Sequence, residues 1–291
     1  MNSYLEIFLS AYSGYWNYLT NEILNPSWNN YFYWLIALSL LVWLAEIAFP
    51  WRKSQSIVRK DFWLDGFYMF FNFFIFSLVL YNGVSMVGVK LFENLLNLIG
   101  IQNLVAIEIS QLPRIIQLLI MFVLADFIQW NIHRLLHRID WLWQFHKVHH
   151  SVKEMGFAAH LRFHWMETVV YKTLQYIPLA MIGFGISDFF IIHIISISIG
   201  HLNHSNINLS YGPLKYILNN PKMHIWHHAK ELPKERRYGV NFGLSLSIWD
   251  YLFKTSYLPS DGKNIELGFA NDEKFQTTFW KQLLIPFFPK K

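Results

Sequence analysis

The stretch NIHRLLHRIDWLWQFHKVHH, residues 131–150, decides the fold, because it places five histidines within twenty residues. All thirteen histidines of the 291-residue chain lie between His133 and His228. Residues three or four apart on a helix share one face, so a run of such histidines can direct its imidazoles at one point. An isolated pair is typical of packed or surface histidines, but five runs predict a shared metal site, since imidazole binds iron, copper, zinc and nickel. The runs are His133/His137, His146/His149/His150, His160/His164, His201/His204 and His224/His227/His228.

Composition indicates a membrane protein. The chain is 54% hydrophobic and 19% aromatic, and 15% of its residues are charged, against about 25% in a typical soluble domain. The alternative is a soluble protein with a very apolar core, but several apolar runs approach the length of a membrane span. The chain has no cysteine, so a transition metal must rest on histidine, carboxylate and water. The net charge of +5 is scattered, which disfavours nucleic acid as a partner.

The apolar runs predict an all-α integral membrane helical bundle of three to four spans. We expect spans over residues 31–49 and 62–88 and a third that starts at Pro113. The loop after the first span holds four basic residues, against none in residues 1–30, which places it in the cytoplasm by the positive-inside rule. Alternation of the spans then predicts a cytoplasmic, histidine-rich helical cap over residues 133–167.

Residues 168–200 are apolar again but are divided by Gly183 and Gly185. We expect either a helical hairpin that dips into the membrane and returns, or one span broken at the glycines. Residues 1–30 predict a short interfacial helix, and residues 89–112 an amphipathic stretch on the outer side. The predicted domains are an N-terminal membrane region with two transmembrane helices (1–112), a di-metal domain (113–255) and a cytoplasmic tail (256–291).

The supply of histidines fits two metal ions better than one tetrahedral zinc, which needs three or four ligands. Soluble di-iron bundles use Glu and Glu-x-x-His motifs, and the sequence offers no such set, so the hypothesis is a nearly all-histidine di-metal site at a membrane face. Asp126 lies two helical turns before His133, and we expect it to accept the second ring N–H of that ligand. His193, alone in an apolar helix, is interpreted as a core residue rather than a ligand.

Several motifs, in order, resemble those of the fatty acid hydroxylase superfamily, also called the sterol desaturase family. They are DFIQWNIHRLLH (126–137), WQFHKVHHS (143–151), LRFHWME (161–167), NHSN (203–206), NNPKMHIWHH (219–228) and NFG followed by SIWDYLF (241–253). The resemblance covers about residues 120–255. It implies an integral membrane fold with a cytoplasmic helical cap and a di-iron site of two Fe2+ ions, with zinc as a substitute metal. It also implies O2-dependent hydroxylation or desaturation of a lipid.

Carried over residue by residue, the resemblance implies nine metal ligands, a wider set that ligate or support them, and no separate catalytic side chain. Arg138 stands where the alkylglycerol-type enzymes have glutamate, and Trp165 stands where proline is usual; both bear on substrate choice. The nine ligands are His133, His137, His146, His149, His150, His204, His224, His227 and His228. The wider set is His164, His201, His160, Asp126, Glu167 and Asn206, and Asn241, Trp249 and Asp250 match a trailing, structural pattern.

The resemblance implies a membrane-bound oxygenase that hydroxylates a C–H bond of a sterol, fatty acyl chain or related lipid. The alternatives within the family are a lipid desaturase and an alkylglycerol- or carotenoid-type monooxygenase. The lipid is expected to enter from the bilayer, and electrons to come from an external ferredoxin, cytochrome b5-like protein or pterin. A metal transporter or metal-binding membrane protein is the rival, but its ligands would follow several spans rather than one face. We expect a bacterial inner membrane rather than an endoplasmic reticulum, because the first residues lack the basic start of a signal peptide.

Overall fold

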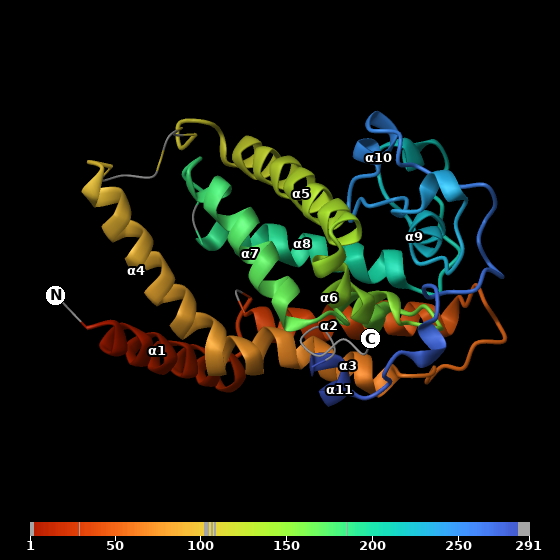
Figure 1. The fold of residues 1–291 in the computed structure, drawn as a ribbon, viewed down its shortest axis with the longest axis horizontal. Helices are drawn as coiled ribbons and strands as arrows, with labels where there is room; N and C mark the ends of the chain where they lie inside the picture. The colour runs from red at the N-terminus through yellow and green to blue at the C-terminus, as the bar shows by residue number, and fades with distance from the viewer. Residues whose placement is uncertain are drawn as a thin grey trace.

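The computed structural model describes residues 3–28, 30–101, 105, 107, 109–184 and 186–284. Within these ranges the chain is helical, with isolated β-bridges but no strand, which confirms the all-α prediction (Figure 1). The α-helices are α1 (Tyr4–Leu24), α2 (Tyr31–Ala48), α3 (Phe62–Phe70), α4 (Asn82–Leu98), α5 (Arg114–Arg138), α6 (Asp140–His150), α7 (Trp165–Ala180), α8 (Ile186–His204), α9 (Pro221–His227), α10 (Ile248–Leu252) and α11 (Phe279–Leu284).

Three helices are long and apolar enough to cross a membrane: α2, the continuous helix Phe62–Leu98, and α5. Each coincides with a predicted span. The start of α2 is fixed by Asn30, whose side chain accepts a hydrogen bond from the N–H of Tyr33, and α5 begins directly after Pro113. Proline suits a helix start because its missing N–H would have had no partner there. The end of α5 carries the first histidines out of the apolar segment.

The second span is longer than predicted, because its helix continues to Leu98 instead of ending near Gly88. Two π-helical segments, Phe71–Ile75 and Ser77–Tyr81, join α3 to α4 without a break. The extension packs along α1, and the two helices form an arm at one side of the molecule (Figure 1). Much of the stretch expected to be a separate amphipathic segment is therefore helix, stabilised by a contact with α1 that local hydropathy does not report. The expected short interfacial helix is the 21-residue α1.

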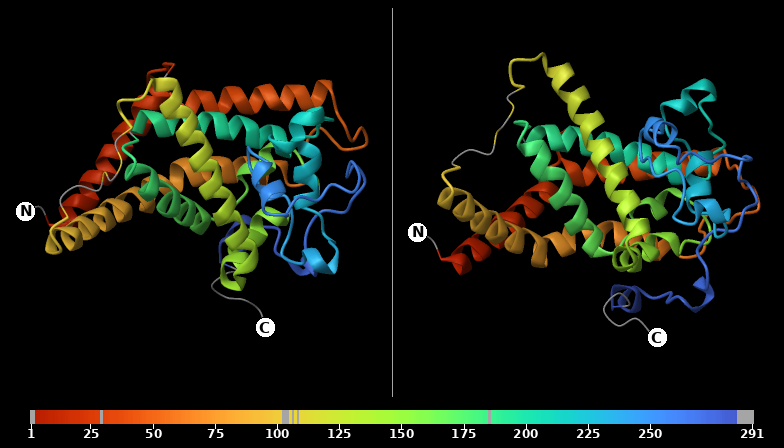
Figure 2. Two further views of the ribbon diagram at one scale, coloured as in Figure 1. Left: turned by 90° about the horizontal axis from the view of Figure 1, so that it is seen from above. Right: turned by 45° about the horizontal axis from the view of Figure 1, so that its top comes forward.

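The apolar stretch 168–200 forms two helices, α7 and α8, joined by a turn. Gly183 in that turn has φ +82°, a left-handed conformation that glycine adopts without steric cost. Gly185, the other predicted break point, lies outside the described residues. α8 runs beside α2 (Figure 2) and also packs against α5 and α9. This arrangement aims its final residue, His204, at the histidines of α6 and α9.

The segment after α10, predicted as a tail, folds back onto the helical bundle. Gln282 of α11 accepts a hydrogen bond from the hydroxyl of Tyr68 on α3, at 2.9 Å. Asp272 forms an ion pair with Lys153 of the loop after α6. These contacts cover the buried side of α3 and close one side of the region that holds the histidines.

Candidate metal centre

The nine histidines predicted as ligands come together in two groups. α5 contributes two of them, α6 three, α8 its last residue, and α9 with the residue after it three. Within each group, one nitrogen of every ring lies within 4.8 Å of the corresponding nitrogens of the others. The groups adjoin, since the rings of His150 and His228 stack with centroids 4.4 Å apart. The first histidine group is His133, His137, His146, His150 and His227, and the second histidine group is His149, His204, His224 and His228.

Ring nitrogens of different histidines face one another within each group, and in the second group one such pair has no proton to share. Nδ1 of His133 lies 2.8 Å from the backbone carbonyl oxygen of Phe242, so Nδ1 carries the proton and donates it. Nε2 of His133 is then an acceptor, yet it lies 3.1 Å from Nε2 of His146. Likewise, His149 and His204 donate from Nδ1 to backbone carbonyls while their Nε2 atoms lie 3.3 Å apart. Opposed lone pairs repel, and a cation between them removes the repulsion, so the residues present fit metal ions.

Burial keeps these rings in the neutral form that binds metals. Desolvation lowers the pKa of the His149 imidazole to about 3, and it lowers the pKa values of His150 and His228 well below the usual value for histidine. Neutral imidazole is the ligand form, so metal binding needs no loss of a proton here. The site is therefore ready for a metal across the physiological pH range.

A loop after α9 orients the first histidine group. The carbonyl oxygen of Val240 accepts from Nδ1 of His227 at 2.7 Å, as that of Phe242 accepts from His133. Asn241, between them, has φ +52°, a left-handed conformation that asparagine tolerates better than most residues. Its side-chain amide donates to the backbone carbonyls of Met223 and Tyr257. The trailing NFG motif thus directs two carbonyls at two ligands, and a backbone partner of this kind fixes the tautomer of a ligand ring.

Glu167 is the acidic residue in contact with the first histidine group. One of its oxygens lies 2.8 Å from Nδ1 of His146, and the other accepts from the backbone N–H of His164 at 3.3 Å. Burial raises the pKa of the Glu167 carboxyl to about 8. The sequence signal for this role was the H-x-x-E spacing, because the carboxylate three residues into a helix also closes the capping box at its start.

The prediction that Asp126 supports His133 is wrong. The oxygens of Asp126 accept instead from the backbone N–H groups of Ser245 and Leu246 and from the indole N–H of Trp249. Helical spacing places Asp126 and His133 on one face. The backbone N–H groups of the loop before α10 donate to Asp126, and the carbonyl of Phe242 in the same loop accepts from His133. Asp126 therefore anchors the loop rather than a ligand.

Matched substitutions separate these two carboxylates. Asp126→Asn is expected to lower the free energy of unfolding by about 1–3 kcal/mol, because an amide nitrogen cannot accept the bonds that a carboxylate oxygen accepts, while metal content stays unchanged. Glu167→Gln is expected to lower metal affinity by about 10–100-fold, because the partner of His146 is weakened. Thermal unfolding and metal titration of both variants check this. A loss of metal in the Asp126 variant would contradict the assignment.

The remaining candidates surround the two groups without joining them. His160 and His201 lie with Nδ1 atoms 3.3 Å apart, and His201 also contacts the hydroxyl of Ser39.

His164 caps α7 through Nδ1 and donates from Nε2 to the carbonyl of Leu283, so both its ring nitrogens are used. Asn206 pairs with the backbone of Arg52 and fixes a loop. His193 joins neither group, and its ring contacts the hydroxyl of Tyr31 at 3.2 Å.

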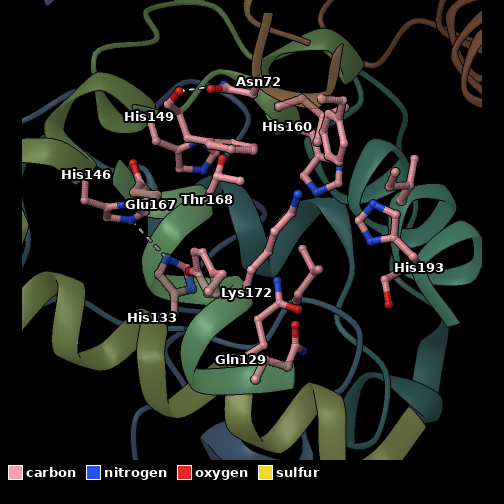
Figure 3. A pocket seen from close by; sticks show the side chains of 18 of the residues that line it. Asn72, Gln129, His133, His146, His149, His160, Glu167, Thr168, Lys172 and His193 are labelled. Atoms are coloured by element: carbon pink, nitrogen blue, oxygen red, sulfur yellow. Dashed lines mark hydrogen bonds and ion pairs between the residues drawn. The ribbon is translucent and has the colours of Figure 1, made fainter. Parts of the chain in front are cut away.

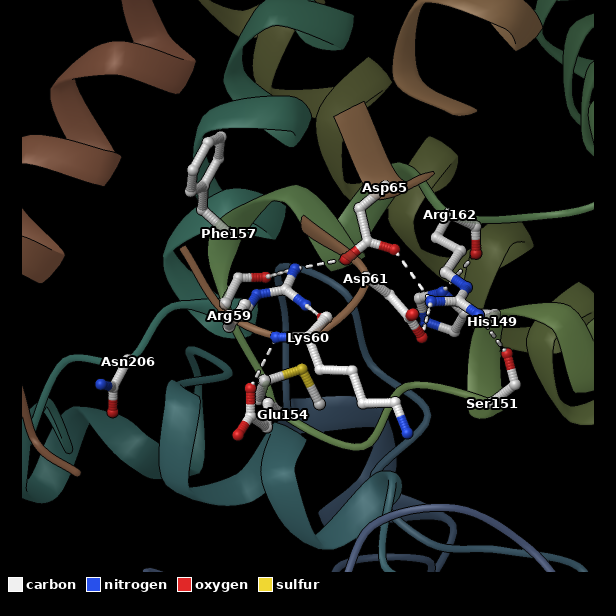
Figure 4. A network of polar contacts seen from close by, with 12 residues as sticks. Arg59, Lys60, Asp61, Asp65, His149, Ser151, Glu154, Phe157, Arg162 and Asn206 are labelled. Carbon is white, nitrogen blue, oxygen red and sulfur yellow. Dashed lines mark hydrogen bonds and ion pairs between the residues drawn. The ribbon is translucent and has the colours of Figure 1, made fainter. Parts of the chain in front are cut away.

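A buried ion-pair network fixes the segment that holds His149 (Figure 4). The guanidinium of Arg162, 1% exposed, lies 3.1 Å from both Asp61 and Asp65. The other oxygen of Asp65 binds Arg59 at 2.5 Å. Because the backbone carbonyl of Arg162 accepts from Nδ1 of His149, the network ties α3 to the second histidine group. The pattern of charged residues along the chain did not predict this network.

A cavity of about 150 Å³ opens beside both histidine groups. His133 and His146 of the first group and His149 of the second line one end (Figure 3). From there the cavity extends between α7 and α8 past Lys172 to His193. A ligand in this cavity would have one part against the metal-binding nitrogens and another among the side chains of α7.

The chain spans about half the length, or less, of the curated relatives it matches. Over 178 residues it is 34% identical to the ornithine lipid hydroxylase OlsE of Rhizobium tropici, covering 61% of this chain and 52% of that protein. It is 28% identical to human alkylglycerol monooxygenase over 137 residues, 46% of this chain and 29% of that protein. It is 28% identical over 143 residues to the very-long-chain aldehyde decarbonylase GL1-10 of Oryza sativa subsp. japonica, 48% of this chain and 46% of that protein.

No solved structure is significantly similar to the chain. The family profile described as fatty acid hydroxylase matches residues 118–255. These residues run from α5 to α10 and contain all nine histidines of the two groups. The resemblance seen in the sequence motifs is confirmed for this part of the chain: residues 118–255 match the fatty acid hydroxylase family.

Proposed function

We propose that this chain is a membrane-bound di-iron oxygenase that uses O2 to hydroxylate a C–H bond of a lipid. The observation that carries the proposal is the pair of adjoining histidine groups, five of whose rings line the cavity. Relatives named as an ornithine lipid hydroxylase and an alkylglycerol monooxygenase support lipid hydroxylation. The first histidine group would hold one iron ion and the second the other.

Iron ions bound in these groups would supply the activation of O2 and the oxidation of the C–H bond. The side chains do the rest. The backbone carbonyls after α9 and Glu167 would hold the ligand rings in one orientation, and the cavity would position the lipid beside them. Hydroxylation consumes O2, two electrons and two protons to give an alcohol and water. An external donor, a ferredoxin, a cytochrome b5-like protein or a pterin, would supply the electrons.

The proposed location of the metal centre rests on the three candidate spans and on the charged residues beside them. The loop after α2 holds Arg52, Lys53, Arg59 and Lys60, which favours the cytoplasmic side. The histidine groups lie on the same side as this loop, since Asn206, two residues after His204, pairs with Arg52. We propose that the metal centre lies on the cytoplasmic face of a bacterial inner membrane, and the bacterial source of one relative supports the choice of membrane.

The test is to express the chain in iron-replete cells under oxygen-18-labelled O2 and to compare their membrane lipids by mass spectrometry with those of cells that carry an empty vector. A lipid that gains one labelled oxygen atom only in cells with the chain is the expected result. A lipid that loses two hydrogens without gaining oxygen would identify a desaturase. Unchanged lipids, from cells in which the purified protein contains iron, would contradict the proposal.

A further inference from the structure

Lys172 places a positive charge in the cavity beside the histidine groups. It lies on α7 five residues after Glu167, about 7.5 Å further along the helix axis, and it extends among the cavity residues in Figure 3. Its ammonium lies 4.3 Å from the ring centroid of Tyr81. Within the described part of the chain Lys172 forms no ion pair and no side-chain hydrogen bond.

The acids of α7 and α8, the two helices between which the cavity extends, are already engaged. Glu167, the acid of α7, binds His146 and the backbone of His164. Asp188, the acid of α8, pairs with Arg114. A partly buried ammonium without a counter-charge is unfavourable, and a cation–π contact of this kind offsets only part of that cost. A negatively charged ligand would supply the counter-charge that the Lys172 ammonium lacks.

Two further polar atoms of the cavity wall lack partners. Oδ1 of Asn72 and Oγ1 of Thr168 are buried and form no hydrogen bond, and both residues line the same cavity. A buried polar atom without a partner destabilises the folded protein. A bare acyl chain or sterol ring in this cavity would leave both unsatisfied, whereas a ligand with polar groups would not.

We propose that the cavity binds the anionic head of a lipid, with a carboxylate or phosphate on Lys172 and polar groups of the same head on Asn72 and Thr168. This proposal rests on the proposed function, because the cavity ends at the histidine groups. Its volume of about 150 Å³ is that of a cavity that holds a benzene ring, so it takes a head group rather than a whole acyl chain. The carbon presented to the metals therefore lies a few bonds from the charge.

Equilibrium binding to the full-length protein in neutral phosphatidylcholine nanodiscs tests this proposal. The probes share one chain and differ in the head: dodecanoate, dodecyl phosphate, dodecanol and dodecyltrimethylammonium, with binding to empty nanodiscs subtracted. We expect at least one anionic probe to bind about tenfold or more tightly than dodecanol and the cationic probe to bind most weakly. Lys172→Met should remove the preference and Lys172→Arg should retain it. Lys274→Met, the same change at an exposed lysine, should leave all four affinities unchanged.

The ranking of the two anionic probes distinguishes a carboxylate head from a phosphate head, and either ranking supports the proposal. Equal binding of anionic and neutral probes to the wild-type protein would overturn it, as would an anionic preference that persists in Lys172→Met. Binding is measured without turnover, so the result stands apart from the labelled-oxygen experiment. A lysine-dependent preference in a protein that oxidises no lipid would refute the proposed function and leave the anion site in place.

Discussion

Replacing His149 and His227 together by alanine is expected to abolish metal binding and, with it, lipid oxidation. The pair removes one ligand from each histidine group. Loss of a residue that only supports a ligand costs about 10–100-fold in metal affinity or activity, so loss of ligands from both groups should cost more than about 100-fold. Elemental analysis of protein from iron-replete cells should find two iron ions per wild-type chain and none in the double variant. Each single variant should lose the ion of its own group.

His164→Ala is the matched control, because His164 is a buried histidine of the same domain whose ring nitrogens serve a helix cap and a backbone carbonyl. It should keep both ions, although its helix start is weakened. Far-ultraviolet circular dichroism would show whether each variant keeps its helices. Retention of both ions by a folded double variant would mean that the ligands are other residues, and the assignment of the two histidine groups would fail.

Asp65→Asn is expected to produce the largest loss of stability. Asp65 is fully buried and binds Arg59 with one oxygen and Arg162 with the other. Removing one partner of a buried ion pair leaves uncompensated charge and typically costs about 3–5 kcal/mol. Because Arg162 also holds His149 through its backbone carbonyl, the second histidine group should lose metal at a lower temperature than the first. Thermal unfolding of the metal-loaded protein at one fixed scan rate checks both effects.

Asp61→Asn provides the comparison, since Asp61 lies at the same 3.1 Å distance from Arg162 but its side chain is 20% exposed. Water can replace part of what that carboxylate provides, and an exposed pair contributes only about 0–1 kcal/mol. A small effect is therefore expected. If the two substitutions destabilise equally, burial of the ion pair is not what makes Asp65 important.

Local patterns predicted which histidines come together, and long-range contacts determined their hydrogen-bond partners. The spacing of His146, His149 and His150 follows from the geometry of one helix, so the sequence suffices to place them together. The partner of His133 could not be predicted in this way, because the carbonyl of Phe242 lies 109 residues further along the chain. Asp126 has the helical spacing expected of a partner for His133, but it bonds the backbone of Ser245 and Leu246, which are also far away in the sequence.

The helix boundaries show the same limit. Hydropathy located the three candidate spans, because apolar length is a local property. It did not predict that α4 continues to Leu98, because α4 packs along α1 and that contact joins segments far apart in the sequence. The cavity lining was likewise not predictable, because Asn72, Thr168 and His193 come from three separate helical segments and meet only in the folded chain.

Both histidine groups depend on the last ligand segment, since His227 belongs to the first and His224 and His228 to the second. A chain leaves the ribosome from its N-terminus, so neither group is complete until α9 has emerged and the spans before it have been synthesised. Metal would therefore enter as a late step of biogenesis, after insertion into the bilayer. The chain has no cysteine and so no disulfide. The ions would then act as crosslinks between α5, α6 and α8, which are synthesised first, and α9, which is synthesised last.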